Sequence, residues 1–436
     1  MEKFVIDGGI ALSGTIVPAG NKNGALPILA ASVLTEDEVV VRNVPKIKDV
    51  GAMLAILEAL GVRVTWLSDH EVALCAADLT ADEAVIDRDL SERIRASFLL
   101  AGPLLARFGR VRMPPPGGDV IGRRRLDPHL DAFASLGATF EHGRDIELRA
   151  PGGLRAGDVF MDEPSVMATE NALLAAARTP GSTVIGNAAC EPHVQDLGRM
   201  LVKMGADIQG IGSNVLTVNG SGELHGCDHT IGPDHIEIGS FMALAGVTGG
   251  ELRIRDTIPA DLRMIRLVFD RLGLRSELDG GDVIVPGGQD LVISRDVGEH
   301  KIKVQDGPWP AFPADLTSIA VALATQCSGS ALIHEWMFEN RMIFTDKLVL
   351  MGADITMCDP HRAIITGPSQ LRGERLESPD IRAGMAMLIA ALAARGTSEI
   401  GNIAQIDRGY ERIDERLQNL GARIERVAIE SVPASA

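Results

Sequence analysis

The segment from Pro114 to His129 holds the densest set of side chains that could do chemistry. It reads PPPGGDVIGRRRLDPH and combines the carboxylate of Asp119 with three consecutive arginines, Arg123 to Arg125, before Asp127 and His129. Proline lacks an amide donor and paired glycines are costly in a helix, so the segment is predicted to be an exposed, mobile loop. Guanidinium groups bind phosphate oxygens in a bidentate fork, so this loop suits an anionic ligand. The alternative is a solvated turn with scattered charge.

Composition limits what kind of protein carries this loop. A chain of 436 residues is predicted to form two domains. The net charge of −17 argues against a nucleic-acid partner, so any phosphate site must be local. The longest apolar run, Met385 to Ala394, is too short to span a bilayer, and the first residues do not resemble a secretory leader. We therefore expect a cytoplasmic protein without a membrane partner.

The cysteines give no sign of a disulfide framework or a metal site. Their number is odd, they are scattered, and no CxxC pair occurs. Free thiols are the simplest prediction for all of them, which are Cys75, Cys190, Cys227, Cys327 and Cys358.

One short pattern recurs six times and indicates how the chain is built. An apolar helical run ends in Leu-Gly or Met-Gly and passes into a strand, at intervals of 68 to 79 residues. Glycine suits a helix C-terminus because the left-handed residue that ends a helix costs least without a Cβ. The six pairs are Leu60-Gly61, Leu136-Gly137, Met204-Gly205, Leu272-Gly273, Met351-Gly352 and Leu420-Gly421.

A second pattern, an Ala/Leu-rich helix followed by a strand, interleaves with the first. In the run from Leu90 to Arg107, apolar residues at a spacing of three to four predict one continuous helix. Six helix-strand-helix-strand units of about 70 residues are therefore predicted. The six occurrences of the second pattern span residues 29–41, 99–113, 173–185, 243–254, 322–333 and 391–400.

The predicted fold class is α/β, with three units in each of two domains and a break near Gly232-Pro233. Helices so rich in Ala, Leu and Met should be buried on most sides, with the strands outside them. The sequence lacks GxGxxG after a first strand and also lacks GxxxxGK, so neither a dinucleotide-binding fold nor a P-loop is supported.

Several short motifs, in order, show that the chain resembles the enolpyruvyl transferases from Gly9 to about Val427. The motifs are Gly20–Asn23 with Ala25–Pro27, Ile94–Ser97 with Gly102–Leu104, Pro116–Gly122 with Arg124, Asp127 and His129, Pro164–Val166, Ala168–Asn171, Asn187–Ala189, Pro310–Pro313 with Asp315, Phe338–Arg341 and Ile406–Arg412.

The resemblance implies two inside-out α/β barrel domains, each made of three repeated βαβαββ-type units. The first domain is expected at residues 22–233 and carries the loop 114–129. The second comprises residues 1–21 plus 234–436 and carries the general base. The run from Arg124 to His129 is similar to the uridine-binding segment of the family's cell-wall branch.

The resemblance to that branch also implies a reaction. Enolpyruvate would move from phosphoenolpyruvate to the 3'-hydroxyl of UDP-N-acetylglucosamine with release of phosphate, as the first committed step of peptidoglycan precursor synthesis. The family uses no metal or organic cofactor.

Asp119 stands where many family members have a cysteine, and the resemblance assigns it the role of proton donor to the methylene carbon of phosphoenolpyruvate. A carboxyl group donates a proton only when it is protonated, and the sequence leaves that state open. Because a carboxylate replaces the thiolate that fosfomycin alkylates in this family, we expect fosfomycin resistance. The structural alternative is a turn-forming aspartate after two glycines.

Asp315 resembles the family's aspartate that receives the hydroxyl proton, and it could equally cap the helix that follows. The remaining assignments come from matched motifs. The other catalytic candidates are Lys22 and Arg408, which with Arg124 resemble the phosphoenolpyruvate clamp. The candidates for substrate binding are Asn23, Arg95, Arg124, Asp127, His129, Ser165, Val166, Met337 and Arg382.

Near the expected binding site for the acceptor substrate, four residues differ from the family's usual sequence motifs. They are Met167, Cys190, His193 and Trp309. They keep two alternatives open. One is a related transferase acting on another nucleotide or nucleotide sugar. The other is a non-catalytic nucleotide-sugar-binding protein, against which the presence of all four catalytic candidates argues.

Overall fold

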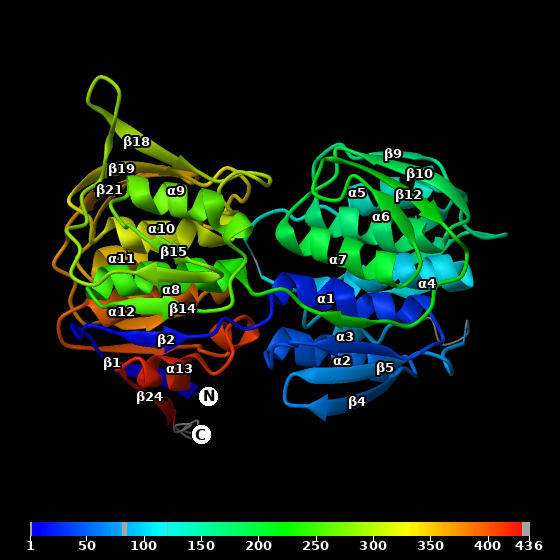
Figure 1. Ribbon diagram of the computed structural model, residues 1–436, viewed down its shortest axis with the longest axis horizontal. Coiled ribbons are helices and arrows are strands. Elements are labelled where there is room, and N and C mark those ends of the chain that lie inside the picture. Colours follow the sequence, from blue (N-terminus) through cyan, green and yellow to red (C-terminus); the bar gives the residue numbers. More distant parts are fainter. Residues whose placement is uncertain (1, 81–84, 120, 430–436) are drawn as a thin grey trace, which may run out of the picture. The chain divides into compact units, whose positions relative to one another are not determined.

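The computed structural model describes residues 2–80, 85–119 and 121–429, which fall into two compact units (Figure 1). Unit 1 comprises Met1–Pro18, Val120–Arg123 and Pro233–Ala436, and unit 2 comprises Ala19–Asp119 and Arg124–Gly232.

Unit 2 contains three sheets among its described residues, with strand orders β13-β3-β5-β4, β6-β8-β7 and β11-β12-β10-β9. Its strands are β3 (Val39–Arg42), β4 (Arg63–Ser68), β5 (Glu71–Cys75), β6 (Arg110–Met113), β7 (Thr139–His142), β8 (Ile146–Arg149), β9 (Asp158–Phe160), β10 (Gly181–Gly186), β11 (Asp207–Gln209), β12 (Val215–Gly220) and β13 (Asp228–Thr230). Its helices are α1 (Lys22–Ala31), η1 (Ser32–Leu34), α2 (Lys48–Ala59), α3 (Arg88–Ser91), η3 (Arg95–Leu100), α4 (Ala101–Phe108), α5 (Asp127–Ser135), α6 (Val166–Arg178) and α7 (Pro192–Lys203).

Unit 1 likewise contains three sheets among its described residues, ordered β22-β23-β1-β24, β15-β16-β14-β2 and β17-β18-β19-β21-β20. Its strands are β1 (Glu2–Asp7), β2 (Gly14–Ile16), β14 (Leu252–Ile254), β15 (Glu277–Asp279), β16 (Asp282–Val285), β17 (Arg295–Asp296), β18 (His300–Gln305), β19 (Gly329–His334), β20 (Asp354–Asp359), β21 (Arg362–Gly367), β22 (Arg375–Glu377), β23 (Thr397–Gly401) and β24 (Arg423–Ala428). Its helices are α8 (His235–Thr248), η4 (Pro259–Leu262), α9 (Arg263–Arg271), η5 (Ala314–Leu316), α10 (Thr317–Ala324), α11 (Thr345–Leu350), α12 (Ile381–Ala393), η6 (Ile406–Arg408) and α13 (Ile413–Asn419).

The predicted repeat is visible in the order of the elements. The run β9-α6-β10-α7-β11-β12 builds one sheet, in which β9 and β10 are parallel and the later pairs are antiparallel. The run β18-α10-β19-α11-β20-β21 repeats the same pattern in unit 1. The α/β fold with three repeats per unit is confirmed, although the sheets are separate rather than joined into closed barrels.

The Leu-Gly and Met-Gly pairs end helices as predicted. All six glycines have positive φ values, between +89° and +106°, which is the conformation that favours a residue without Cβ. They are Gly137, Gly205 and Gly61 in unit 2, and Gly273, Gly352 and Gly421 in unit 1.

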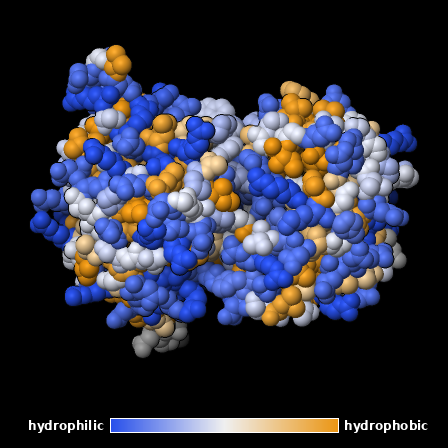
Figure 2. Space-filling view, in the orientation of Figure 1, coloured by the Kyte–Doolittle hydropathy of each residue, from blue (hydrophilic) through white to orange (hydrophobic). Residues whose placement is uncertain are grey.

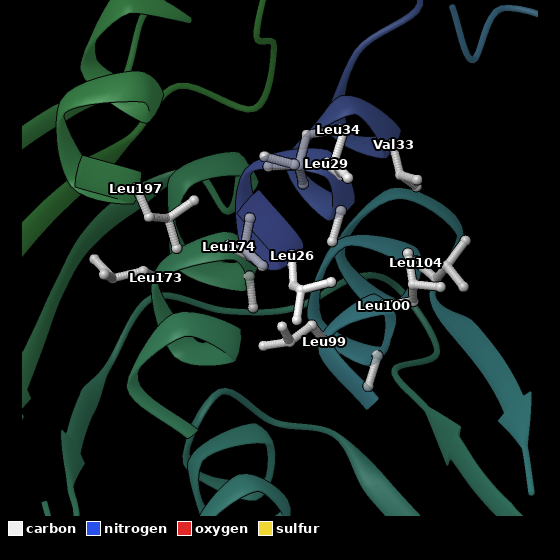
Figure 3. Packing of buried hydrophobic residues seen from close by; sticks show 14 of the residues in the cluster. Leu26, Leu29, Val33, Leu34, Leu99, Leu100, Leu104, Leu173, Leu174 and Leu197 are labelled. Atoms are coloured by element: carbon white, nitrogen blue, oxygen red, sulfur yellow. The ribbon is translucent and has the colours of Figure 1, made fainter. Parts of the chain in front are cut away.

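The apolar helices form the centre of each unit, as the composition predicted. In α12 every residue from Ile381 to Leu392 is buried, and α8 and α10 pack against it in Figure 1. In unit 2, Figure 3 shows Leu26 of α1, Leu99 of η3 and Leu173 of α6 within one buried cluster. Helices buried on most sides explain why these segments lack the usual polar face.

The prediction of one helix from Leu90 to Arg107 is wrong. The chain forms α3, then η3 and α4, with Ile94 extended between them at φ −138° and ψ 144°. The Ser97 hydroxyl donates to the carbonyl of Ser91 and to that of Ile94 at 3.1 and 3.0 Å. Such side-chain bonds compete with the helical backbone pattern and so account for the break.

The surface of the described residues carries hydrophobic side chains in scattered patches among hydrophilic ones, on the face that Figure 2 shows. Within those residues no helix combines the length and hydropathy that crossing a bilayer requires. All five cysteines lie within the described residues, and none of them is paired in a disulfide there.

Candidate functional site

The stem of the loop packs closely against the backbone of unit 2. It is irregular, as predicted, but Pro114 is buried and residues 116–119 are half-buried rather than exposed. A Cβ on Gly117 would lie 1.8 Å from the carbonyl oxygen of Glu92, and one on Gly118 would lie 2.8 Å from Cβ of Arg95. Only glycine allows this approach, which places Asp119 directly after a fixed stem.

The next described loop residues belong to unit 1. The Asn340 NH donates to the carbonyl of Ile121 at 3.0 Å, and the Arg123 NH donates to Oε2 of Glu339 at 3.1 Å. The intervening Val120 lies outside the described residues.

Arg95 holds the returning end of the loop in unit 2. Its Nη2 donates to the carbonyls of Arg124 and Arg125, at 2.6 and 3.2 Å. Burial, together with the Arg124 charge, lowers the pKa of Arg95 to about 10. An anion beside these two guanidinium groups would relieve both effects, so the pair has the electrostatics of a phosphate or carboxylate site.

His129, a predicted substrate contact, lies in the core of unit 2. It is 2% exposed, its Nδ1 lies 2.9 Å from Nδ2 of Asn171, and its ring meets Phe98 edge-on at 5.0 Å. Burial, with the Arg95 charge, lowers the pKa of His129 to about 3, so the ring is neutral at physiological pH. This geometry supports a role in anchoring α5 behind the loop.

Lys22 and Asn23 begin α1, whose N-terminus is capped by the Asn21 side chain accepting from Gly24 at 2.9 Å. The Lys22 Nζ lies 3.0 Å from Oδ2 of Asp49, and both side chains are buried. A buried lysine so paired is held in one geometry, which suits a fixed contact to an anionic ligand.

Three further predicted residues of unit 2 lie at helix starts. Ser165 caps α6, with its hydroxyl accepting from the Ala168 NH at 3.4 Å, and Val166 is the first residue of that helix. Asp127 begins α5, is exposed, and lies 3.4 Å from Nε of Arg125. Helix N-termini favour anionic ligands, and the first turn of α6 holds no acidic residue that would oppose one, whereas the start of α5 carries the Asp127 carboxylate itself.

Asp315 lies between two guanidinium groups in unit 1. Its Oδ1 accepts from Nη2 of Arg341 at 3.1 Å, and its Oδ2 accepts from Nε of Arg382 at 3.1 Å. Arg341 and Arg382 are each 4% exposed, whereas the Asp315 side chain is 24% exposed. The two buried guanidinium groups therefore hold the carboxylate in place, while part of the carboxylate remains accessible to solvent, which is what a general base requires.

A polar network extends behind Arg382. Its Nη1 donates to the Tyr410 hydroxyl at 3.3 Å, which lies 3.0 Å from the hydroxyl of Ser240. Burial disfavours the Arg382 charge, but Asp315, Tyr410 and Asp234 outweigh it and raise the pKa of Arg382. Arg382 therefore stays charged beside Asp315 at physiological pH.

The other predicted residues of unit 1 also contact neighbouring groups of their own unit. Arg408 ends η6 and its Nη1 donates to Oε1 of Gln405 at 2.9 Å. The Met337 NH donates to Oδ2 of Asp306 at 3.3 Å. The structure thus groups the predicted residues in two sets. Unit 1 holds Asp315, Met337, Arg382 and Arg408, and unit 2 holds Lys22, Asn23, Arg95, Asp119, Arg124, Asp127, His129, Ser165 and Val166.

The sequence reasoning missed two residues that these contacts identify. Arg341 ends the Phe338–Arg341 motif, and that motif was the signal that could have singled it out beside Asp315. Asp49, in the first turn of α2, pairs with Lys22 and therefore lies next to a catalytic candidate.

Three of the four residues that depart from the family's motifs have identifiable packing contacts, and the fourth, Cys190, is half-buried. Met167 is half-buried against the core of unit 2, and His193 is 5% exposed, with its Cβ 3.4 Å from where a Cβ on Gly24 would stand. Trp309 precedes a cis proline and meets the ring of His235 edge-on at 5.9 Å.

Comparisons with known proteins identify the family that this chain matches. Residues 6–417 match the family model of EPSP synthase (3-phosphoshikimate 1-carboxyvinyltransferase). A Bradyrhizobium diazoefficiens protein named UDP-N-acetylglucosamine 1-carboxyvinyltransferase is 54% identical over 98% of each chain. A Treponema denticola protein of the same name is 51% identical, covering 98% of this chain and 99% of its own.

Solved structures show the same fold. The enolpyruvyl transferase NikO from Streptomyces tendae has a TM-score of 0.85 at 25% identity and covers 98% of each chain. An EPSP synthase from Acinetobacter baumannii has a TM-score of 0.73 at 19% identity, over 98% of this chain and all of its own.

Proposed function

The chain belongs to the EPSP synthase (3-phosphoshikimate 1-carboxyvinyltransferase) family. From this premise we propose that it transfers enolpyruvate from phosphoenolpyruvate to the 3'-hydroxyl of UDP-N-acetylglucosamine and releases phosphate. The observation that carries this proposal is the 54% identity, over 98% of each chain, to a protein named for this reaction. The reaction would open peptidoglycan precursor synthesis. We place it in the cytoplasm, where nucleotide sugars are made.

In this proposal the cations of unit 2 bind phosphoenolpyruvate. Lys22, Arg95 and Arg124 supply the positive charge, and the repulsion between the two guanidinium groups is relieved when the anion binds. Arg408 of unit 1 is proposed as a further contact. The starts of α5 and α6, with Asp127 and Ser165, are proposed to border the nucleotide.

The proton transfers are divided between two carboxyl groups. Asp119 gives a proton to the methylene carbon of phosphoenolpyruvate, so the adjacent carbon becomes electrophilic. Asp315 removes the proton from the acceptor hydroxyl as its oxygen bonds to that carbon, while Arg341 and Arg382 hold Asp315 in place. Loss of phosphate, together with one proton from the new methyl group, then restores the carbon–carbon double bond and leaves the enol ether.

A phosphate-release assay tests the reaction. The protein is incubated with phosphoenolpyruvate and, in separate reactions, UDP-N-acetylglucosamine, UDP-glucose and shikimate 3-phosphate. We expect release only with UDP-N-acetylglucosamine, and a product one enolpyruvyl group heavier by mass spectrometry. Turnover with another acceptor alone would identify a related transferase, and binding without any turnover would identify a non-catalytic protein.

Fosfomycin should leave this protein active. The drug forms a covalent bond with a thiolate in this family, and Asp119 offers a carboxylate instead. We expect the rate of phosphate release to stay within about twofold of the untreated rate after incubation with the drug, whereas the Asp119→Cys variant should lose activity with time. Rapid, irreversible inactivation of the unmodified protein would contradict the assignment of Asp119.

A further inference from the structure

Two carboxyl groups lie buried near the candidate base in unit 1. Glu335 directly follows β19 and is 0% exposed, and Asp306 directly follows β18 and is 2% exposed. The backbone NH groups of Trp336 and Met337 both donate to the Asp306 carboxylate. The chemistry proposed for Asp315 uses neither of these buried acids.

Arg341 connects Glu335 to Asp315. The Nη2 atom of its guanidinium group donates to Oδ1 of Asp315 at 3.1 Å. The Nε atom of the same group lies 3.8 Å from Oε2 of Glu335. Neither that Nε nor that Oε2 has a hydrogen-bond partner among the described residues, although both atoms are buried. One cation is thus shared between two carboxyl groups.

We propose that Glu335 is a positioning residue for Asp315 and acts through Arg341, because an ionised Glu335 carboxylate neutralises the guanidinium group and leaves Asp315 a stronger base. The inference rests on the proposed function, since it requires Asp315 to take the proton of the acceptor hydroxyl. Its consequence is that the rate of the chemical step depends on the ionisation of a group that does not touch the substrate.

The pKa of Glu335 sets the pH range in which its ionisation would affect Asp315. Burial raises the pKa of Glu335 to about 8, Arg341 acts in the opposite direction, and Asp306 adds to the rise. The Thr317 hydroxyl of α10 also faces the carboxyl group, and His361, after β20, contacts the Glu335 main chain. As the pH falls below this pKa, Glu335 becomes mostly neutral and more of the Arg341 charge acts on Asp315. As the pH rises through it, Glu335 ionises and shares that charge.

The Glu335→Gln variant separates this role from a purely structural one. Glutamine is nearly isosteric with the neutral acid, so below pH 7 the kcat values of the two proteins should agree within about twofold. Across pH 8 the ratio of wild-type to variant kcat should rise by about three- to tenfold, the size of coupling between neighbouring groups. The readout is kcat for phosphate release from phosphoenolpyruvate with UDP-N-acetylglucosamine, between pH 6 and 9.5.

Two comparisons sharpen the experiment. In the Arg341→Gln background the Glu335→Gln change should have no further pH-dependent effect, because the connecting cation is gone. Glu170→Gln is the matched control: Glu170 is 1% exposed, lies on α6 of unit 2, and has a pKa that burial also raises. This control should keep the wild-type pH profile.

A ratio that is constant with pH would overturn the proposal, whether the variant equals the wild type or is uniformly weaker with a lower melting temperature. The same alkaline loss in Glu170→Gln, or its persistence without Arg341, would overturn it too. Absence of phosphate release by the wild-type protein would instead overturn the proposed function itself.

Discussion

Replacing Asp315 with asparagine is expected to lower kcat for phosphate release by about 10²- to 10⁴-fold, the usual contribution of a general base. Asparagine keeps the size of the side chain but cannot accept the hydroxyl proton. Its amide would also place NH groups or a weaker acceptor against Arg341 and Arg382, which now donate to two carboxylate oxygens. We therefore also expect a loss of stability of about 1–3 kcal/mol, since two buried guanidinium groups lose their anionic partner.

The measurement must separate lost chemistry from lost folding. Steady-state rates are taken well below the melting temperature, and the affinity for UDP-N-acetylglucosamine is measured by calorimetry, which should change less than kcat. Asp279→Asn is the matched control, because it breaks another Arg–carboxylate contact of unit 1, at 2.9 Å from Arg253, on the exposed surface. A kcat within threefold of wild type in Asp315→Asn would remove Asp315 from the mechanism.

Local signals in the sequence predicted much of the fold. The glycine after each Leu or Met has a positive φ because a helix end needs that conformation at that residue, so a reader of the sequence can place six helix ends without tertiary information. Buried helices such as α12 could likewise be predicted from their apolar composition, because a helix buried on all sides needs no polar face.

Contacts between distant segments were harder to predict. The break within the predicted helix from Leu90 to Arg107 depends on where the Ser91 and Ser97 hydroxyls point. The contact between Arg341 and Asp315 joins residues 26 positions apart, on different segments. Periodicity carries no information on such pairings, and only the Phe338–Arg341 motif signalled Arg341 at all.

The same limit applies to burial at the candidate site. From the sequence, His129 looked like a loop residue available to a substrate, because it follows Asp127 in a charged run. In the structure it faces Phe98 and Asn171, since it lies in the first turn of α5, where Pro128 and Leu130 are buried as well. The sequence around a histidine does not by itself show whether its side chain is exposed on a loop or buried in a helix.

Replacing Asp119 with alanine is expected to reduce kcat by about 10²- to 10⁴-fold or more, because no other group would give the proton to the methylene carbon of phosphoenolpyruvate. The stem glycines fix where this side chain begins: Gly118, with φ +108°, packs on Arg95, so Asp119 follows at a set position near the proposed anion site. Alanine fits the same backbone, and the melting temperature should stay within about 2 °C.

Two measurements bear on this role directly. In D₂O, proton delivery to the methylene carbon places solvent deuterium in the product, and Asp119→Ala should lose this label together with turnover. Asp119→Cys should retain part of both, because a thiol also donates a proton. Asp131→Ala, which removes an exposed carboxylate from α5 of the same unit, should match the wild type. If Asp119→Ala kept a near-normal rate with deuterium in its product, the proton would have to come from another group, and the loop would serve only to bind the substrate.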